Sequence, residues 1–187
     1  WGVAAFVFLS AIAHFLIAGP LFGAYSRQLR QGRTDFRWIE YALSASWMIV
    51  LIAMLTGASD FAALLGLFGV NAAMILFGLI AERSGQPGGS GWQLPFWLGT
   101  LFGAVPWIII AINLWAPGQD SSAPTFVYVI FVTIFVFFDS FAVNFWLQYR
   151  RVGRWRSYLF GETAYVVLSL VAKSLLAWQV FAGALAS

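Results

Sequence analysis

The chain contains one lysine, Lys173, which lies in the middle of its last apolar segment. That segment reads YLFGETAYVVLSLVAKSLLAWQVFAGALA. Placing an ammonium group at the centre of a bilayer costs roughly 2.5–3.5 kcal/mol on insertion scales. Such a lysine therefore needs a partner or a chemical task. An amine in a dry pocket can condense with an aldehyde to form a Schiff base, and this is the sharpest chemical hypothesis that the sequence offers.

A cation at Lys173 needs an anion, and few acids lie within the apolar segments. Glu40 is the simplest partner because it lies at a plausible depth in an earlier segment. Asp139 and Glu162 are the rival acids. The alternative interpretation is that the lysine only forms a structural salt bridge between helices.

One acid and one hydroxyl share a helix face with the lysine. Glu162, Ser169 and Lys173 stand at positions i, i+7 and i+11, which fall on one side of a helix. Glu162 is also close to Arg154 and Arg156 in the sequence, so we interpret it as an acid at the membrane interface.

Glu40 and the only histidine also have polar neighbours at helical spacing. Arg37 precedes Glu40 by about one turn, and Ser44 follows it by one turn. Ser10 and His14 form a similar pair in the first apolar segment. His14 is open to two interpretations, a packing residue or a proton carrier.

The composition excludes a soluble domain. Hydrophobic residues make up 61% of the chain and charged residues only 9%, whereas soluble domains carry about 25% charged residues. The absence of cysteine excludes disulfides and thiolate metal sites, and we expect no metal site of any kind. The net charge of +3 comes from arginines clustered in short loops, so no continuous basic face for nucleic acid is expected.

Six apolar stretches are long enough to cross a bilayer, which takes about 20 residues. Continuous apolar runs of this length indicate helices, so the sequence predicts an all-α, polytopic membrane bundle in one domain, 1–187. The expected spans are about 1–25, 35–57, 60–82, 93–116, 124–149 and 157–185. The chain begins with Trp1 inside an apolar run, and we expect a segment to precede it in the native protein.

The arginines predict the orientation of the bundle. All nine lie in, or beside, the connections after the first, third and fifth spans, whereas the opposite loops hold Asp60 and Asp120. By the positive-inside rule the arginine-rich loops are cytoplasmic, and the C-terminus of this chain is extracellular.

Three segments resemble the heliorhodopsin family of retinal proteins. They are RWIEYALSAS (37–46), NAAMILFG (71–78) and ETAYVVLSLVAKSLLAW (162–178). The spacing of roughly 130 residues between the glutamate of the first segment and the lysine of the last also fits. The resemblance implies a seven-helix rhodopsin-like fold, of which this chain holds six helices and lacks the first.

The resemblance also implies roles for individual residues. Lys173 matches the lysine that binds all-trans retinal as a protonated Schiff base, and Glu40 matches its counterion. Arg37 matches an arginine placed to tune that carboxylate, and Ser169 matches a serine beside the Schiff base. His14 resembles a histidine in a polar cavity, with Ser10 beside it. The expected pocket further comprises Ser44, Met48, Asn71, Met74, Ile75, Gly78, Trp97, Pro106 and Phe138.

These matches imply a light-sensing photoreceptor with a slow photocycle and little or no ion transport, and not an enzyme. The second span has no carboxylate beyond Glu40, so a proton-pump donor is missing from that half. A light-driven proton or ion transporter using Asp139 or Glu162 is one alternative. A retinal-free membrane protein with a structural Lys173–Glu40 pair is the other.

The sequence also indicates two interactions with other molecules. Gly19-x-x-x-Gly23 and Gly99-x-x-x-Gly103 permit close helix contact and favour a homodimer. The loop 150–156, with four arginines, could dock a cytoplasmic signalling protein, although its arginines also suit membrane topology and contact with anionic lipid.

Overall fold

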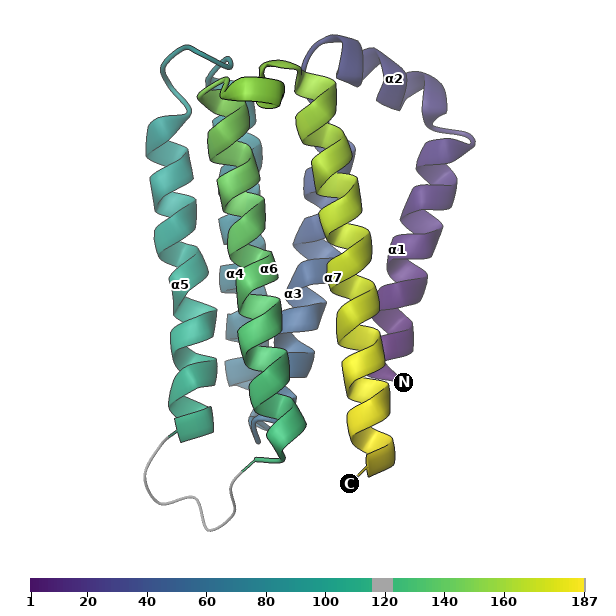
Figure 1. Ribbon diagram of the computed structural model, residues 1–187, viewed down its shortest axis with the longest axis vertical. Coiled ribbons are helices and arrows are strands. Elements are labelled where there is room, and N and C mark those ends of the chain that lie inside the picture. The colour runs from purple at the N-terminus through teal and green to yellow at the C-terminus, as the bar shows by residue number, and fades with distance from the viewer. Residues whose placement is uncertain (116–122, 187) are drawn as a thin grey trace.

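The computed structural model describes residues 1–115 and 123–186, and these fold into a bundle of α-helices. The helices that cross the bundle from end to end are α1 (Gly2–Ala18), α3 (Asp35–Leu55), α4 (Phe61–Ser84), α5 (Gln93–Trp115), α6 (Thr125–Tyr149) and α7 (Tyr158–Ala186). A short helix, α2 (Phe22–Arg30), and a 3₁₀ turn, Gly153–Arg156, lie at one end (Figure 1). The all-helical architecture is as expected, and the described residues contain no strand.

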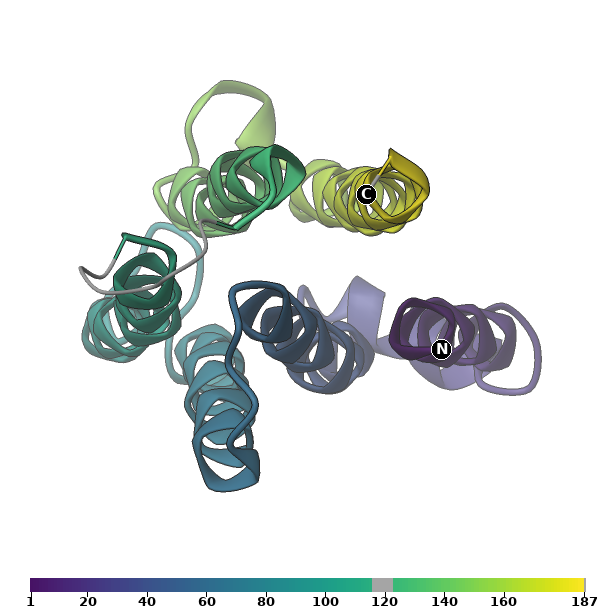
Figure 2. The ribbon, with the colours of Figure 1, turned by 90° about the horizontal axis from the view of Figure 1, so that it is seen from below.

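Helices α3 to α7 are each long and apolar enough to cross a membrane. Viewed along the bundle, α1, α3, α4, α5, α6 and α7 follow one another in an arc that brings α7 opposite α3 and α1 (Figure 2). Helix α3 is the most buried of the spanning helices, and it lies where side chains from the first and last helices can reach it.

The first span differs from the expected 1–25. Helix α1 ends at Ala18, and α2 turns away from it by 79° after a break of three residues. The break contains Gly19 and Pro20, and proline kinks or breaks a helix because it lacks an N–H and clashes with the preceding turn. Arg27 and Arg30, which were expected in a loop, therefore lie in a short helix across the end of the bundle.

The arginine-rich segments gather at one end of the bundle. Helix α2, the turn after α4 and the 3₁₀ turn before α7 all lie at that end, whereas both chain termini lie at the other (Figure 1). Asp60 caps α4 at the opposite end by accepting a hydrogen bond from the Ala63 N–H at 2.7 Å. Asp120 lies outside the described residues.

The interior has two apolar clusters, one toward each end. The cluster near the termini includes Phe6, Met48 and Trp107, and the cluster near the arginines includes Trp38, Phe145 and Tyr165. Many large apolar side chains on the outer faces are exposed, as expected for helices surrounded by lipid.

Gly78 allows α4 to approach the indole of Trp38 on α3. A Cβ at Gly78 would overlap the Trp38 ring, whereas nothing lies within 4 Å of a Cβ at Gly69 on the same helix. We expect Gly78→Ala to lower the free energy of unfolding by about 1–3 kcal/mol, the usual cost of overpacking. The measurement is unfolding of the protein in mixed micelles. Gly69→Ala is the matched control and should be neutral or slightly stabilising; equal effects of the two changes would contradict this close packing.

Candidate functional site

Lys173 and Glu40 meet between α7 and α3. The Lys173 Nζ atom lies 2.6 Å from Glu40 Oε1, and the two side chains are only 12% and 4% exposed. Nζ also lies 5.3 Å from the centre of the Tyr41 ring. The structure thus brings together the two residues that the charge pattern singled out, with the cation held by one carboxylate oxygen and the face of one aromatic ring.

Helix α1 adds a hydroxyl to this pair. Ser10 Oγ donates to Glu40 Oε1 at 2.5 Å, so the same carboxylate oxygen receives Ser10 and Lys173. His14 lies differently from the expectation. Its ring is exposed, and its Nδ1 is 2.7 Å from the Ser10 backbone carbonyl, one turn earlier on α1. The structure therefore brings Ser10 to the lysine pair but leaves His14 on an outer face of α1.

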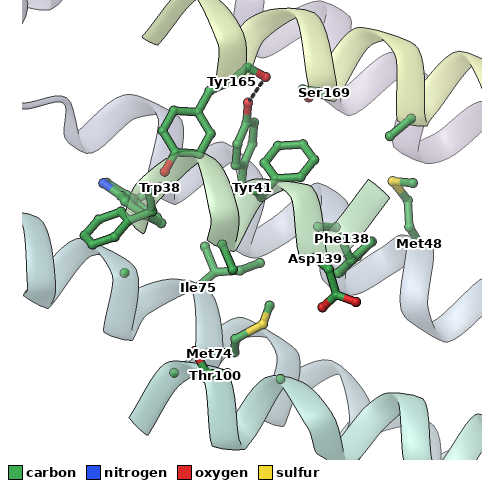
Figure 3. A pocket seen from close by; sticks show the side chains of 18 of the residues that line it. Trp38, Tyr41, Met48, Met74, Ile75, Thr100, Phe138, Asp139, Tyr165 and Ser169 are labelled. Atoms are coloured by element: carbon green, nitrogen blue, oxygen red, sulfur yellow. Dashed lines mark hydrogen bonds between the residues drawn. The ribbon is translucent and has the colours of Figure 1, made fainter. Parts of the chain in front are cut away.

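A cavity of about 300 Å³ opens beside the lysine, between α7 on one side and α4 and α5 on the other (Figure 3). Its wall is mostly apolar, and helices α3 and α6 complete it. Eight of the residues expected from the sequence line it: Ser44, Met48, Met74, Ile75, Gly78, Phe138, Ser169 and Lys173. In Figure 3 Ser169 and Tyr165 stand on the α7 side, opposite Met74 and Thr100.

Three expected pocket residues do not line this cavity. Trp97 is 60% exposed on α5, and Pro106 is buried on the same helix but away from the cavity wall. The cavity side of α5 follows a helical stripe that runs through Gly99, Gly103 and Trp107, and Trp97 lies off that stripe.

Asn71, the third of them, lies on α4 and joins that helix to α3. Its Nδ2 donates to Ser46 Oγ at 3.1 Å, and both residues are fully buried. Asn71 therefore has a structural partner between two helices instead of a place in the cavity wall.

Arg37 does not contact Glu40, contrary to the expectation. Its Nη2 lies 3.1 Å from Glu82 Oε1 and 2.9 Å from Glu162 Oε1. Side chains in a helix lean toward its N-terminus, so Arg37 extends toward the arginine-rich end and away from Glu40. Among the described residues Glu162 forms its ion pair with Arg37, and not with the expected neighbours Arg154 and Arg156, and its side chain is 5% exposed.

The sequence reasoning missed most of the aromatic wall of the cavity. Trp38, Tyr41, Trp107, Phe141, Phe145 and Tyr165 all line it. Tyr41 Oη donates to the Tyr165 carbonyl at 2.9 Å, which joins α3 to α7 near the lysine (Figure 3). Tyr41 follows Glu40 directly, and Tyr165 precedes Ser169 by one turn, so helical spacing from the two central residues was the signal that could have found them.

The Gly99-x-x-x-Gly103 motif has a contact within the chain. A Cβ at Gly99 would press on the Met74 carbonyl and on Phe77, and a Cβ at Gly103 would press on the Met74 sulfur. These glycines let α5 approach α4 and line the cavity, so they do not support a dimer.

A bundle of membrane helices around an aromatic-lined cavity, with a lysine in its wall that pairs with a buried carboxylate, has the architecture of a rhodopsin-like retinal protein. The heliorhodopsin family model matches residues 1–185, and the chain belongs to that family. No curated protein matches the chain. Membership of the family implies a retinal chromophore and a photoreceptor type of function in a multi-pass membrane protein.

Proposed function

We propose that the protein is a light-sensing photoreceptor in which Lys173 carries all-trans retinal as a protonated Schiff base and Glu40 is its counterion. The observation that carries the proposal is that Lys173, which lines an apolar cavity, holds its Nζ 2.6 Å from Glu40 Oε1. A structural salt bridge alone would not need a cavity on one side of the amine.

The residues of the cavity fit such a chromophore. Ligand pockets typically have volumes of roughly 300–1,000 Å³ and apolar, aromatic walls with few polar groups, and this cavity has about 300 Å³. Met74, Ile75 and Phe138 would contact the hydrocarbon part of the ligand, and Ser44 and Ser169 are among the few polar groups in the wall. Bound retinal supplies absorption of visible light and a light-driven isomerisation.

The residues around Lys173 have defined electrostatic tasks. An opposite charge within about 4–6 Å favours the protonated form of a buried nitrogen, so Glu40 keeps the proton on the Lys173 nitrogen. Ser10 donates to the same Glu40 oxygen and orients the carboxylate. Burial of the pair excludes the water that would hydrolyse the linkage.

The same geometry argues for sensing in preference to ion transport. From Tyr41 to Leu55, helix α3 has no carboxylate with which to continue a proton relay beyond Glu40. We propose that the arginine-rich end faces the cytoplasm, where the segment 150–156 offers a docking surface for a signalling protein. The competing function, a light-driven transporter, is favoured by one observation: Asp139 is an acid in the wall of the cavity.

Flash illumination of the pigment in closed liposomes, with a pH-sensitive dye inside, separates the two functions. We expect slow, reversible absorption changes without a sustained pH change, because no acid follows Glu40 on α3. A sustained pH change that a protonophore abolishes would contradict sensing without transport. If that change also disappears in Asp139→Asn, the transporter alternative is correct.

A further inference from the structure

A second buried group of charges lies between the cavity and the arginine-rich end. Arg37 of α3, Glu82 of α4 and Glu162 of α7 meet there and are called the Arg37 cluster below. Their side chains are at most 5% exposed. The Arg37 guanidinium stacks 3.8 Å from the centre of the Tyr165 ring. The proposed photoreceptor chemistry at Lys173 makes no use of this cluster.

The charges of the Arg37 cluster do not balance if both acids are ionised. One guanidinium then faces two carboxylates, which leaves one buried negative charge. Among the residues that the structure describes, no other cation forms an ion pair with either acid. Arg83, which follows Glu82 in the sequence, pairs with Asp35 at 2.9 Å and is 54% exposed. Carboxyl groups that share one site ionise unequally, so a proton is the most economical way to remove the excess charge.

The remaining titratable groups around the cluster cannot supply the missing positive charge. They are the hydroxyls of Tyr25, Tyr149, Tyr158 and Tyr165, from α2, α6 and α7. A tyrosine hydroxyl is either neutral or negatively charged. The Arg37 cluster already has a net negative charge when both acids are ionised, so a tyrosine cannot balance it. The proton must therefore reside on one of the two glutamates.

Hydrogen bonds distinguish the two glutamates. Glu82 accepts from the Tyr158 hydroxyl at 2.8 Å, from Trp38 Nε1 and from the Thr34 N–H at 3.4 Å, in addition to Arg37. Donors of this kind stabilise the ionised form of a carboxyl group. Within the described residues the buried Oε1 of Glu162 lies near Arg37 but accepts no directed hydrogen bond. We infer that the Arg37 cluster is a proton-binding site in which Glu82 is ionised and Glu162 holds the proton at neutral pH.

The position of the cluster gives this proton a route and a link to the cavity. A second, polar cavity at the arginine-rich end is lined by Glu82 and Tyr158, together with Arg33 and Arg83. The proton can exchange with the aqueous phase at that end through Glu82. On the other side Trp38 and Tyr165 line the apolar cavity and also touch the cluster through the Glu82 hydrogen bond and the Arg37 stacking contact. A change in the shape of the cavity therefore reaches the proton site through two side chains.

The chain has only three glutamates, Glu40, Glu82 and Glu162, which makes a direct test possible. The full chain is labelled with carbon-13 at the glutamate carboxyl and measured by solid-state NMR in lipid bilayers at neutral pH. We expect one carboxyl signal at the chemical shift of a protonated glutamate and two at the chemical shift of an ionised glutamate. Glu162→Gln should remove the protonated signal, whereas Glu40→Gln should remove an ionised one. Three ionised signals in the parent protein, or a protonated signal that survives in Glu162→Gln, would overturn the inference.

Thermal unfolding gives a second readout. Glutamine has nearly the shape of a protonated glutamate, so Glu162→Gln should change the Tm at neutral pH several-fold less than Glu82→Gln. The Glu82 change removes the ionised carboxylate that accepts hydrogen bonds from Tyr158, Trp38 and Thr34. Equal losses of Tm in the two variants would contradict the assignment of the proton to Glu162. Both measurements work without a chromophore, so their failure is distinguishable from failure of the proposed light sensing.

Discussion

Lys173→Ala is expected to abolish the visible absorption band of protein produced with all-trans retinal. The chain has no second lysine that could take over, so the loss should be complete, with only free retinal remaining in the near ultraviolet. Retinal should attach at Lys173 and nowhere else in the cavity, because Lys173 is the only residue of the cavity wall with a primary amine. The measurement is an absorption spectrum of the purified protein in detergent or bilayers.

Lys173→Arg is the matched control for folding. Alanine would leave Glu40 buried and without its cation, and breaking a buried ion pair costs about 3–5 kcal/mol. Arginine keeps the positive charge near Glu40 but cannot form a Schiff base with an aldehyde. We therefore expect the arginine variant to be folded and colourless. A visible band in either variant would disprove covalent attachment at this residue.

The contact between Lys173 and Glu40 could be predicted from the sequence because the number of candidates was small. One lysine and three candidate acids, Glu40, Asp139 and Glu162, leave few pairings, and a buried cation strongly requires an anion. The spans could be predicted for a similar reason, since α3 to α7 each match an apolar run to within a few residues. Both inferences depend on strong local signals.

The partner of Arg37 could not be predicted, because the relevant signal is not local. Helical spacing placed Arg37 beside Glu40, but the direction of its side chain and the approach of α4 decided its contacts. The aromatic wall was missed for a related reason. Aromatic residues make up 19% of the chain, so Tyr41 and Tyr165 did not stand out until the packing of α3 against α7 brought them together.

The bend after α1 shows an intermediate case. The expected first span, about 1–25, runs past Gly19 and Pro20. The structure turns the chain by 79° there because α2 carries two arginines, which a bilayer core does not accept. Charge beyond the breaker was thus the better guide to where the span ends.

Glu40→Gln is expected to shift the visible band strongly and to lower the proton affinity of the Lys173 nitrogen. Glutamine keeps the shape of the side chain but removes the negative charge next to the Lys173 nitrogen. Two unit charges about 4 Å apart interact by about 4 kcal/mol at an effective dielectric constant of about 20. The pH at which half of the visible band is lost should therefore fall in Glu40→Gln. The measurement is an absorption titration of the purified pigment.

The same substitution also predicts the direction of the colour change at low pH, where the proton is still bound. The positive charge of a protonated Schiff base moves away from the nitrogen on excitation, and a carboxylate beside the nitrogen therefore stabilises the ground state more than the excited state. Without that carboxylate the energy gap between the ground and excited states narrows, and the absorption band should move to longer wavelength. Asp139→Asn is the matched control, because Asp139 is an acid of the cavity wall that, among the described residues, forms no ion pair with Lys173. If Asp139→Asn shifts the titration and Glu40→Gln does not, then Asp139 is the counterion, and the contact between Glu40 and Lys173 belongs only to the protein without chromophore.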